Sequence, residues 1–145
     1  RTILNKRDGF RRAFADFDID KVARYTPARV EKLVLDAGIV RHRGKIEAVI
    51  NNARRAREMR DQHGSLGAFF WRYEAPAGKR AAQPVTMSEQ SQALSKDLKK
   101  LGWKFVGPTT VYAFMQSVGM VNDHHPACHH HAACDTARAR FVRPA

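Results

Sequence analysis

Apolar side chains recur at helical spacing along most of this chain, and proline starts and glycine stops divide them into separate segments. Thr26 followed by Pro27 is typical of the first turn of a helix, and Pro108 marks a second such start. Gly38 and Gly64 stand where apolar stripes end, as helix stops do. No segment alternates apolar and polar residues for long enough to indicate a strand. The sequence therefore predicts an all-α fold.

The same pattern predicts where the helices lie. They are expected over residues 1–17, about 26–37, from 42 or 43 to about 63, 66–73, about 88–101 and 108–118. Asp18 or Asp20 is the predicted N-cap of a short turn after the first segment. In the last two helices the residues expected to be buried are Leu94, Leu98, Leu101, Val111, Tyr112, Phe114, Met115 and Val118. Residues 74–85, rich in Ala, Pro, Gly and Lys, are expected to form a surface loop.

The charge balance indicates a polyanionic partner. Among 145 residues, 26 Lys and Arg stand against 14 Asp and Glu, which gives a net charge of +12. Nucleic acid is the first candidate, because cationic side chains bind a phosphate backbone by releasing its counterions. No apolar run approaches the ~20 residues of a membrane span, and no signal peptide is evident in a chain that begins at Arg1. With only Cys128 and Cys134 present, we expect a reduced, cytoplasmic setting.

The connection LGWKFVG at residues 101–107 is a candidate DNA-binding hairpin. Gly102 and Gly107 permit tight backbone conformations, and a helix that starts at Pro108 directs free N–H groups outward. Such a hairpin can hold a phosphate oxygen without reading base sequence, and Lys104 adds positive charge beside it. A glycine stop followed by a proline start also marks an ordinary helix–helix connection. The pattern alone leaves both interpretations open.

His124 and Cys128 form a candidate metal half-site. A histidine and a cysteine four residues apart can converge on one zinc ion from a short loop, but a structural site almost always needs four ligands. Further donors can come from the rest of the segment or from elsewhere in an intact protein. The local candidates are His125, His129, His130, His131 and Cys134. A fortuitous histidine-rich tail with an unpaired thiol explains the same spacing.

Short blocks along the chain resemble the type I DNA-3-methyladenine glycosylase family. They are ALSKDLKK at 93–100, FVGPT at 105–109, YAFMQ at 112–116 and VNDH at 121–124. Upstream, FDIDKVA at 17–23, DAGIVR at 36–41, KIEAVINNA at 45–53 and Gly64-Ser65 with Trp71 resemble the same family in the same order. The resemblance covers about residues 2–128. Several blocks in one order are far more specific than any single motif.

The resemblance implies a helix-hairpin-helix DNA glycosylase-like bundle over residues 1–128. Residues 101–106 would form the hairpin loop against DNA, with Gly102, Lys104 and Gly107 as its DNA-binding residues. Four residues separate the two glycines, where the commonest hairpin has one, but this family uses such a variant. The tail at 129–145 matches nothing in the family and is expected to be irregular.

A zinc-tethered C-terminal segment is a second implication of the resemblance. The family binds one structural zinc ion with two Cys-His pairs, one near the N-terminus and one after the hairpin helix. His124 and Cys128 stand at the second pair, and the first pair would lie before Arg1. The remaining histidines then become tail residues or adventitious binders.

The function that the resemblance implies is base excision: hydrolysis of the N-glycosidic bond of 3-methyladenine in alkylated duplex DNA, with no membrane and no obligate protein partner. The residues that would contact the modified base belong to family segments upstream of Thr2, so no catalytic residue is assigned here. The chain is thus expected to be an N-terminally truncated fragment that lacks efficient excision and binds zinc weakly. The alternatives are a non-catalytic zinc-binding helix-hairpin-helix DNA-binding module, or a basic zinc-binding domain with a protein partner. Five glutamates are expected to be ordinary helix-surface residues: Glu31, Glu47, Glu58, Glu74 and Glu89.

Overall fold

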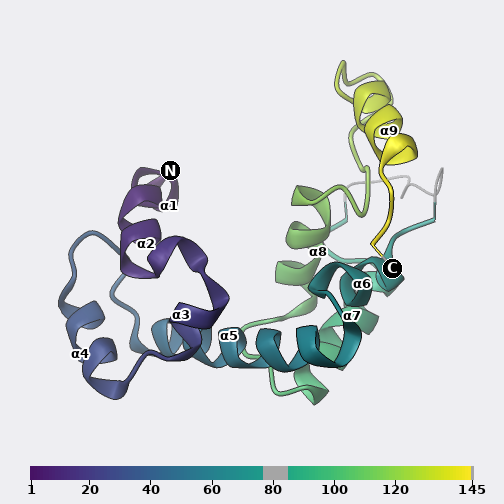
Figure 1. Cartoon of the computed structure of the whole chain (residues 1–145). Coiled ribbons are helices and arrows are strands. Elements are labelled where there is room, and N and C mark those ends of the chain that lie inside the picture. The colour runs from purple at the N-terminus through teal and green to yellow at the C-terminus, as the bar shows by residue number, and fades with distance from the viewer. Residues whose placement is uncertain (77–84, 145) are drawn as a thin grey trace. The chain divides into compact units, whose positions relative to one another are not determined.

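The computed structural model describes residues 1–76 and 85–144, and within these ranges all regular structure is helical (Figure 1). The all-α prediction is confirmed. The elements are α1 (Thr2–Asn5), α2 (Arg7–Ala13), η1 (Ala15–Phe17), α3 (Ile19–Ala23), α4 (Pro27–Leu35), α5 (Arg43–His63), α6 (Leu66–Phe70), η2 (Trp71–Tyr73), α7 (Glu89–Lys100), α8 (Pro108–Ser117) and α9 (His131–Arg140). In the described ranges, no helix is long and apolar enough to cross a membrane.

The chain divides into two compact units, whereas the sequence predicted one helical domain over residues 1–128. The first unit contains residues 1–62 together with the short segment 102–105. The second contains the remaining described residues. The predicted hairpin is therefore shared: residues 102–105 belong to the first unit, and residues 106 and 107 to the second.

The N-terminal part of the first unit is more broken than its sequence pattern predicts. Residues 1–17, expected to be one helical segment, form α1, α2 and η1, because Ala15, Asp16 and Phe17 all adopt positive φ angles of 50° to 61°. Asp18 then caps α3 by accepting a 2.9 Å hydrogen bond from the Lys21 amide, which confirms it as the N-cap. Pro27 is at the start of α4 as predicted, although Thr26 makes no side-chain cap bond.

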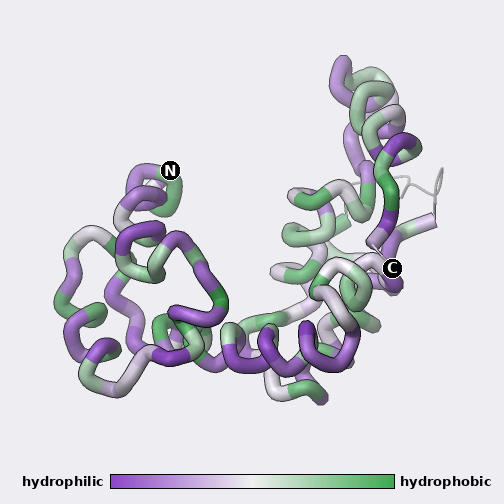
Figure 2. Tube along the Cα trace, in the orientation of Figure 1, coloured by the Kyte–Doolittle hydropathy of each residue, from purple (hydrophilic) through white to green (hydrophobic). Residues whose placement is uncertain are grey.

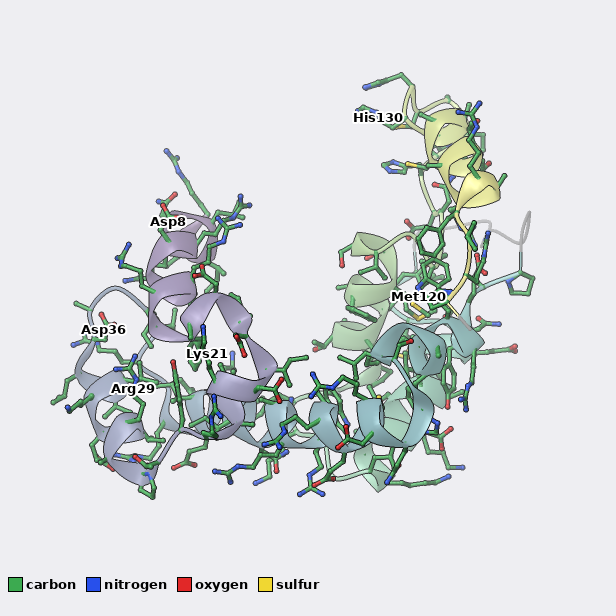
Figure 3. The ribbon with its side chains drawn as sticks, in the orientation of Figure 1. Asp8, Lys21, Arg29, Asp36, Met120 and His130 are labelled. Carbon is green, nitrogen blue, oxygen red and sulfur yellow. The ribbon has the colours of Figure 1, made fainter. Side chains whose placement is uncertain are left out.

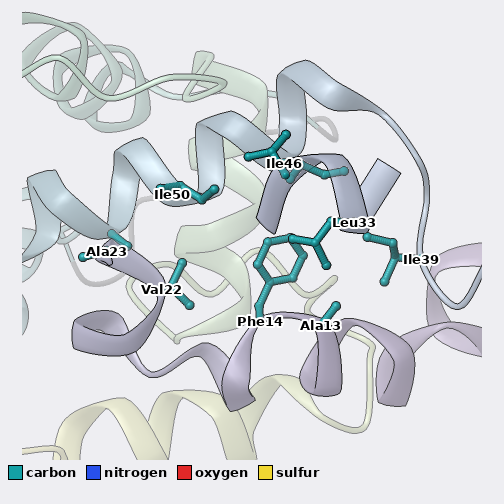
Figure 4. Close-up of a cluster of buried hydrophobic side chains, with 10 residues drawn as sticks. Ala13, Phe14, Val22, Ala23, Leu33, Ile39, Ile46 and Ile50 are labelled. Atoms are coloured by element: carbon teal, nitrogen blue, oxygen red, sulfur yellow. The ribbon is translucent and has the colours of Figure 1, made fainter. Parts of the chain in front are cut away.

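One hydrophobic core holds the first unit together (Figure 4). Phe14, Val22, Leu33 and Ile46 are each only 2 % exposed and come from the end of α2, from α3, from α4 and from α5. Burying such side chains stabilises the unit by roughly 1.5–3 kcal/mol each. The predicted stripe of α5 lies on this core at Ile46, Ile50 and, at its edge, Ala53. Beyond it, the tube of α5 is mostly hydrophilic (Figure 2).

The second unit is built on the contact between α7 and α8. Leu94 of α7 and Met115 of α8 are fully buried, as predicted. A capping box between Ser88 and Ser91 fixes the start of α7. Leu101, predicted to be buried, is 38 % exposed because it lies just past the last turn of α7.

Two further burial predictions in α8 are wrong. Phe114 is 37 % exposed and Val118 is 43 % exposed, whereas Val111, Tyr112 and Met115 are buried. The buried residues recur at one helical face, and the other two lie off it. Of the predicted surface loop, residues 77–84 lie outside the described residues.

The tail differs most from the sequence prediction. Residues 129–145 were expected to be irregular, but residues 131–140 form α9. Alanines at 132, 133, 137 and 139 favour a helix. Tertiary contacts support it, because Arg138 is half-buried and donates 3.0 and 3.1 Å hydrogen bonds to the carbonyls of Ala75 and Met120.

Candidate functional site

Gly102 opens the predicted hairpin in a left-handed conformation, with φ +79°. Glycine adopts this conformation without strain, whereas a side chain would be strained there. Its carbonyl accepts a 2.9 Å hydrogen bond from the side-chain amide of Asn51 in α5. Gly102 therefore has a structural reason to be glycine that is independent of any ligand.

Lys104 is anchored through its main chain and exposed through its side chain. Asn52 of α5 accepts a 2.9 Å hydrogen bond from the Lys104 N–H and donates a 2.9 Å hydrogen bond to the Lys104 carbonyl. Within the described part of the chain, the Lys104 ammonium group has no ion-pair partner. Its charge is therefore available to an external anion.

Phe105 is an exposed aromatic residue in the same short segment. Its side chain is 55 % exposed, and its φ of +57° is unusual for a residue other than glycine. The His42 ring meets the Phe105 ring edge-on, at 6.2 Å between centroids. This contact involves the Phe105 side chain, whereas the hydrogen bonds from Asn51 and Asn52 hold the main chain of residues 102 and 104.

Gly107, in the second unit, is the N-cap of α8. It has an ordinary φ of −62°, no side chain caps the helix, and a Cβ built at Gly107 would meet no atom within 4 Å. The first N–H groups of α8 are thus left without a side-chain partner at an open surface. An uncapped helix N-terminus of this kind attracts anions.

Lys100, the last residue of α7, is engaged in an ion pair within the protein. Lys100 pairs with Asp97 at 2.9 Å, and the same carboxylate accepts a 2.8 Å hydrogen bond from Tyr73. These two bonds, with that from Lys100 the larger cause, lower the pKa of Asp97. Burial in the first place, and the bond to Asp97 in the second, raise the pKa of Tyr73 to about 12. Lys100 therefore stabilises the fold through Asp97, and its charge is already paired.

His124 and Cys128 lie together as the spacing predicted. The Cys128 Sγ is 3.6 Å from the His124 Nδ1. Both side chains lie on the loop between α8 and α9, whose ends are near the labelled Met120 and His130 in Figure 3. Two zinc ligands at 2.3 Å for sulfur and 2.0–2.1 Å for nitrogen, at a tetrahedral angle, would be about 3.6 Å apart. This pair thus fits one edge of a tetrahedral zinc site.

The other candidate ligands do not complete such a site. Among the described residues, no group of three or more His, Cys, Asp or Glu side chains is arranged to hold a metal ion. The His130 ring centroid lies 6.2 Å from that of His124. His131 is 3.5 Å from Asp135, which gives it a local partner. Both cysteines are free thiols.

Polar contacts hold the loop that carries this half-site. Asp123 accepts hydrogen bonds from Tyr112 at 3.1 Å and from Gln116 at 2.7 Å, both on α8. Burial, and secondly the bond to Asp123, raise the pKa of Tyr112 to about 12. On the other side, Asn122 donates to the His131 carbonyl at 3.0 Å and to Asp135 at 2.8 Å. The two residues that directly precede His124 are therefore fixed to α8 and to α9.

Four of the five glutamates are exposed on helices as predicted, but Glu74 follows η2 and is half-buried, so the prediction of a helix-surface residue is wrong there. Glu31 and Glu58 pair at 2.7 Å with Arg43 and Arg55, and Glu74 pairs with Arg138 and Arg143. Hydrogen bonds from arginine side chains are the main cause of the lowered pKa values of Glu31 and Glu74. Groups held ionised in this way are poor general acids at neutral pH. They give no reason to assign a catalytic residue among them.

The sequence did not point to Asn51 and Asn52. Both lie in the block KIEAVINNA, which contributed to the family resemblance, yet two polar residues on a helix predict only a solvated position. Their contact with residues 102 and 104, about fifty positions away, depends on tertiary structure. The only hint in the sequence was that two adjacent asparagines stand next to the apolar stripe of this helix.

Known proteins resemble this chain over most of its length. The family model described as methyladenine glycosylase matches residues 1–131. DNA-3-methyladenine glycosylase 1 of Escherichia coli (strain K12) is 46% identical over 133 residues, which cover 88% of this chain and 71% of that protein.

Solved structures show the same relationship. A crystal structure of 3-methyladenine DNA glycosylase I aligns with a TM-score of 0.80 at 43% identity, covering 88% of this chain and 73% of the other. A tyrosine-to-phenylalanine variant of 3-methyladenine DNA glycosylase I in complex with 3-methyladenine aligns with a TM-score of 0.82 at 35% identity, covering 90% and 73%. The chain belongs to the methyladenine glycosylase family.

Proposed function

We propose that this chain acts in the removal of 3-methyladenine from alkylated duplex DNA. Membership of the methyladenine glycosylase family carries the proposal, since the matched region includes both predicted functional segments. The reaction replaces the base at C1′ of the sugar by water and leaves an abasic site. Alkylation at N3 places positive charge on the base, so it leaves as a neutral molecule and needs little protonation.

Access to the glycosidic bond requires that the damaged nucleotide rotate out of the duplex. This rotation costs a few kcal/mol and costs less for a damaged base. A protein that holds the flanking phosphates can offset the cost by keeping the distorted duplex bound. The hairpin segment and the uncapped start of α8 are the parts of this chain suited to that task.

Phosphate contacts are proposed for each unit separately. In the first unit the Lys104 charge is exposed. In the second unit the start of α8 has no side-chain cap, and a Cβ at Gly107 would meet no atom within 4 Å. Main-chain N–H groups and lysine contact phosphates without regard to base sequence. The test of the whole function is release of free 3-methyladenine from alkylated duplex DNA, and we expect release when the chain is joined to the upstream segment of a relative.

We further propose that His124 and Cys128 are two of four ligands of a structural zinc ion. Their 3.6 Å separation supports this, as do the imidazole nitrogen and the thiolate that they offer, both common zinc ligands. Zinc at such a site fastens separate segments of a protein together and, with four protein ligands, has no open position for a reacting water. The chain's own contribution is to hold the two donors on a loop fixed by Asn122 and Asp123.

Metal analysis tests the zinc proposal. We expect His124→Ala and Cys128→Ser each to reduce bound zinc, measured by equilibrium dialysis and atomic absorption. Cys134→Ser is the matched control and should bind zinc as the unmodified chain does. Full retention of zinc in both ligand variants would assign binding to other residues of the histidine-rich segment.

A further inference from the structure

Asn52 pairs with the main chain of Lys104 as another peptide group would. Its Oδ1 accepts from the Lys104 N–H and its Nδ2 donates to the Lys104 carbonyl, both at 2.9 Å. One side chain thus satisfies both polar groups of a loop residue that lies outside any helix or strand. The loop gains on α5 the two hydrogen bonds that regular structure does not give it.

Asn51 extends this contact to a second loop residue. Its Nδ2 donates to the Gly102 carbonyl at 2.9 Å and to the Asn52 Oδ1 at 3.1 Å. Asn52 Oδ1 therefore accepts two hydrogen bonds, the full capacity of an amide oxygen. Both asparagines are half-buried. The pair holds residues 102 and 104 on one turn of α5.

The loop needs such contacts because its backbone is unfavourable by itself. Phe105, next to the anchored Lys104, has a positive φ angle of 57° although it is not a glycine. A residue other than glycine in this region costs of order 1–3 kcal/mol and persists only when its surroundings fix it. Loss of the asparagine contacts would let the segment relax and spread the Lys104 side chain over many positions.

We infer that Asn52, assisted by Asn51, is a positioning residue for DNA binding, which places the Lys104 ammonium group against a phosphate. The inference rests on the proposed function, in which the hairpin contacts DNA. It also restricts how Lys104 acts. Because Asn52 already occupies its N–H, Lys104 contributes its side-chain charge and not its amide.

A double-mutant cycle on duplex binding tests the inference. Asn52→Ala and Lys104→Ala are made singly and together, and Asn5→Ala is the matched control, since no side-chain hydrogen bond of Asn5 is described within residues 1–76 and 85–144. Affinity for a fluorescein-labelled duplex is measured by anisotropy between 0.05 and 0.2 M salt, values on the order of those used for such slopes. Far-UV circular dichroism confirms that each variant is folded.

We expect Lys104→Ala to weaken binding about tenfold at low salt and to reduce the salt slope by about 0.9, the loss of one phosphate contact. Asn52→Ala should weaken binding about fivefold and reduce the slope in the same direction. In the Lys104→Ala background, Asn52→Ala should add no more than about twofold, because the group that it positions is gone. Asn5→Ala should leave both quantities unchanged.

Two results overturn the inference for different reasons. If Lys104→Ala leaves affinity and slope unchanged, the hairpin anchor itself is wrong and the positioning role falls with it. If Lys104→Ala weakens binding but Asn52→Ala does not, or acts equally in both backgrounds, only the positioning role is wrong. If Asn52→Ala does not fold, Asn51→Ala replaces it in the same cycle. We expect Asn51→Ala to weaken duplex binding only about two- to threefold, since it removes one hydrogen bond to the loop.

Discussion

Gly9 lies where α2 approaches the main chain of Gly38 closely. A Cβ built at Gly9 would lie 2.1 Å from the Gly38 carbonyl oxygen and 2.8 Å from its carbon. Both are main-chain atoms next to the core, so neither can move aside as a flexible side chain would. Glycine is therefore required here for packing, although Gly9 lies within a helix.

We predict that Gly9→Ala lowers the free energy of unfolding by about 2 kcal/mol. Alanine favours a helix over glycine by roughly 1 kcal/mol, but overpacking of this severity costs about 3 kcal/mol or more and outweighs it. Urea unfolding followed by circular dichroism measures the difference. Gly107→Ala is the control, because no atom lies within 4 Å of its Cβ position. A Gly9→Ala variant as stable as the unmodified chain would show that the close approach is absent.

Residue roles were only partly predictable from the sequence. Gly102 and Gly107 were predicted together as DNA-binding glycines, but only Gly102 has a positive φ, and Gly107 is an open N-cap. The spacing of His124 and Cys128 did predict two donors that the structure brings to 3.6 Å. Asn51 and Asn52 were missed because their partners are distant in sequence. Local patterns report the backbone next to them and not the contacts that folding creates.

At the scale of elements, the contact that fixes α9 is a cluster around Glu74. Arg138 and Arg143 bind Glu74 at 3.1 and 2.6 Å, and Arg143 also lies over the Trp71 ring. Phe141 stacks on Trp71 with 4.6 Å between ring centroids. Of these residues, Trp71, Arg138 and Phe141 line a pocket of about 490 Å³ together with His124 and Cys134. The cluster joins the end of the tail to the segment that follows α6.

We predict that Glu74→Gln loosens α9, with a loss of about 1 kcal/mol for a partly exposed charge cluster. The hydrogen bonds from Arg143 are the largest cause of the lowered pKa of Glu74. A lowered folded-state pKa means that this stabilisation is full above the ordinary value of 4.5 and is lost as the pH falls through the lowered value. Protection factors of the α9 amides, measured by hydrogen exchange, should therefore fall below about pH 4.5.

The matched control for this prediction is Glu89→Gln, which removes an exposed carboxylate from the first turn of α7. It should leave α9 protection unchanged at all pH values. Glu74→Gln should lower the protection at neutral pH and remove its pH dependence. Equal protection of α9 in the two variants would mean that the cluster does not hold the tail.

Most helices were predictable because each carries its own signals. Pro27, Pro108 and Gly64 mark ends that the structure reproduces within a residue or two. α9 was missed because it has no apolar stripe, and its stability comes from arginines that reach Glu74 and main-chain carbonyls. The break of the first segment at residues 15–17 was missed as well, since no glycine or proline marks it.

For the molecule as a whole, the +12 charge indicated nucleic acid without distinguishing one basic protein from another. The ordered family blocks made that distinction, and the family match over residues 1–131 bears it out. The described residues offer a hairpin segment with an exposed, unpaired lysine, a helix start without a side-chain cap, and a histidine–cysteine pair of candidate metal donors. The five glutamates considered above either form ion pairs with arginines or lie exposed on helices.

The central claim is that this chain serves 3-methyladenine excision, and the most direct measurement is base release by a chimera. The chimera joins the upstream segment of the Escherichia coli relative to residue 1, and free 3-methyladenine released from methylated duplex DNA is quantified by chromatography. We expect release by the chimera and a reduced rate when the chimera carries Lys104→Ala. A folded chimera that binds duplex DNA but releases no 3-methyladenine would contradict the claim and favour a non-catalytic DNA-binding module.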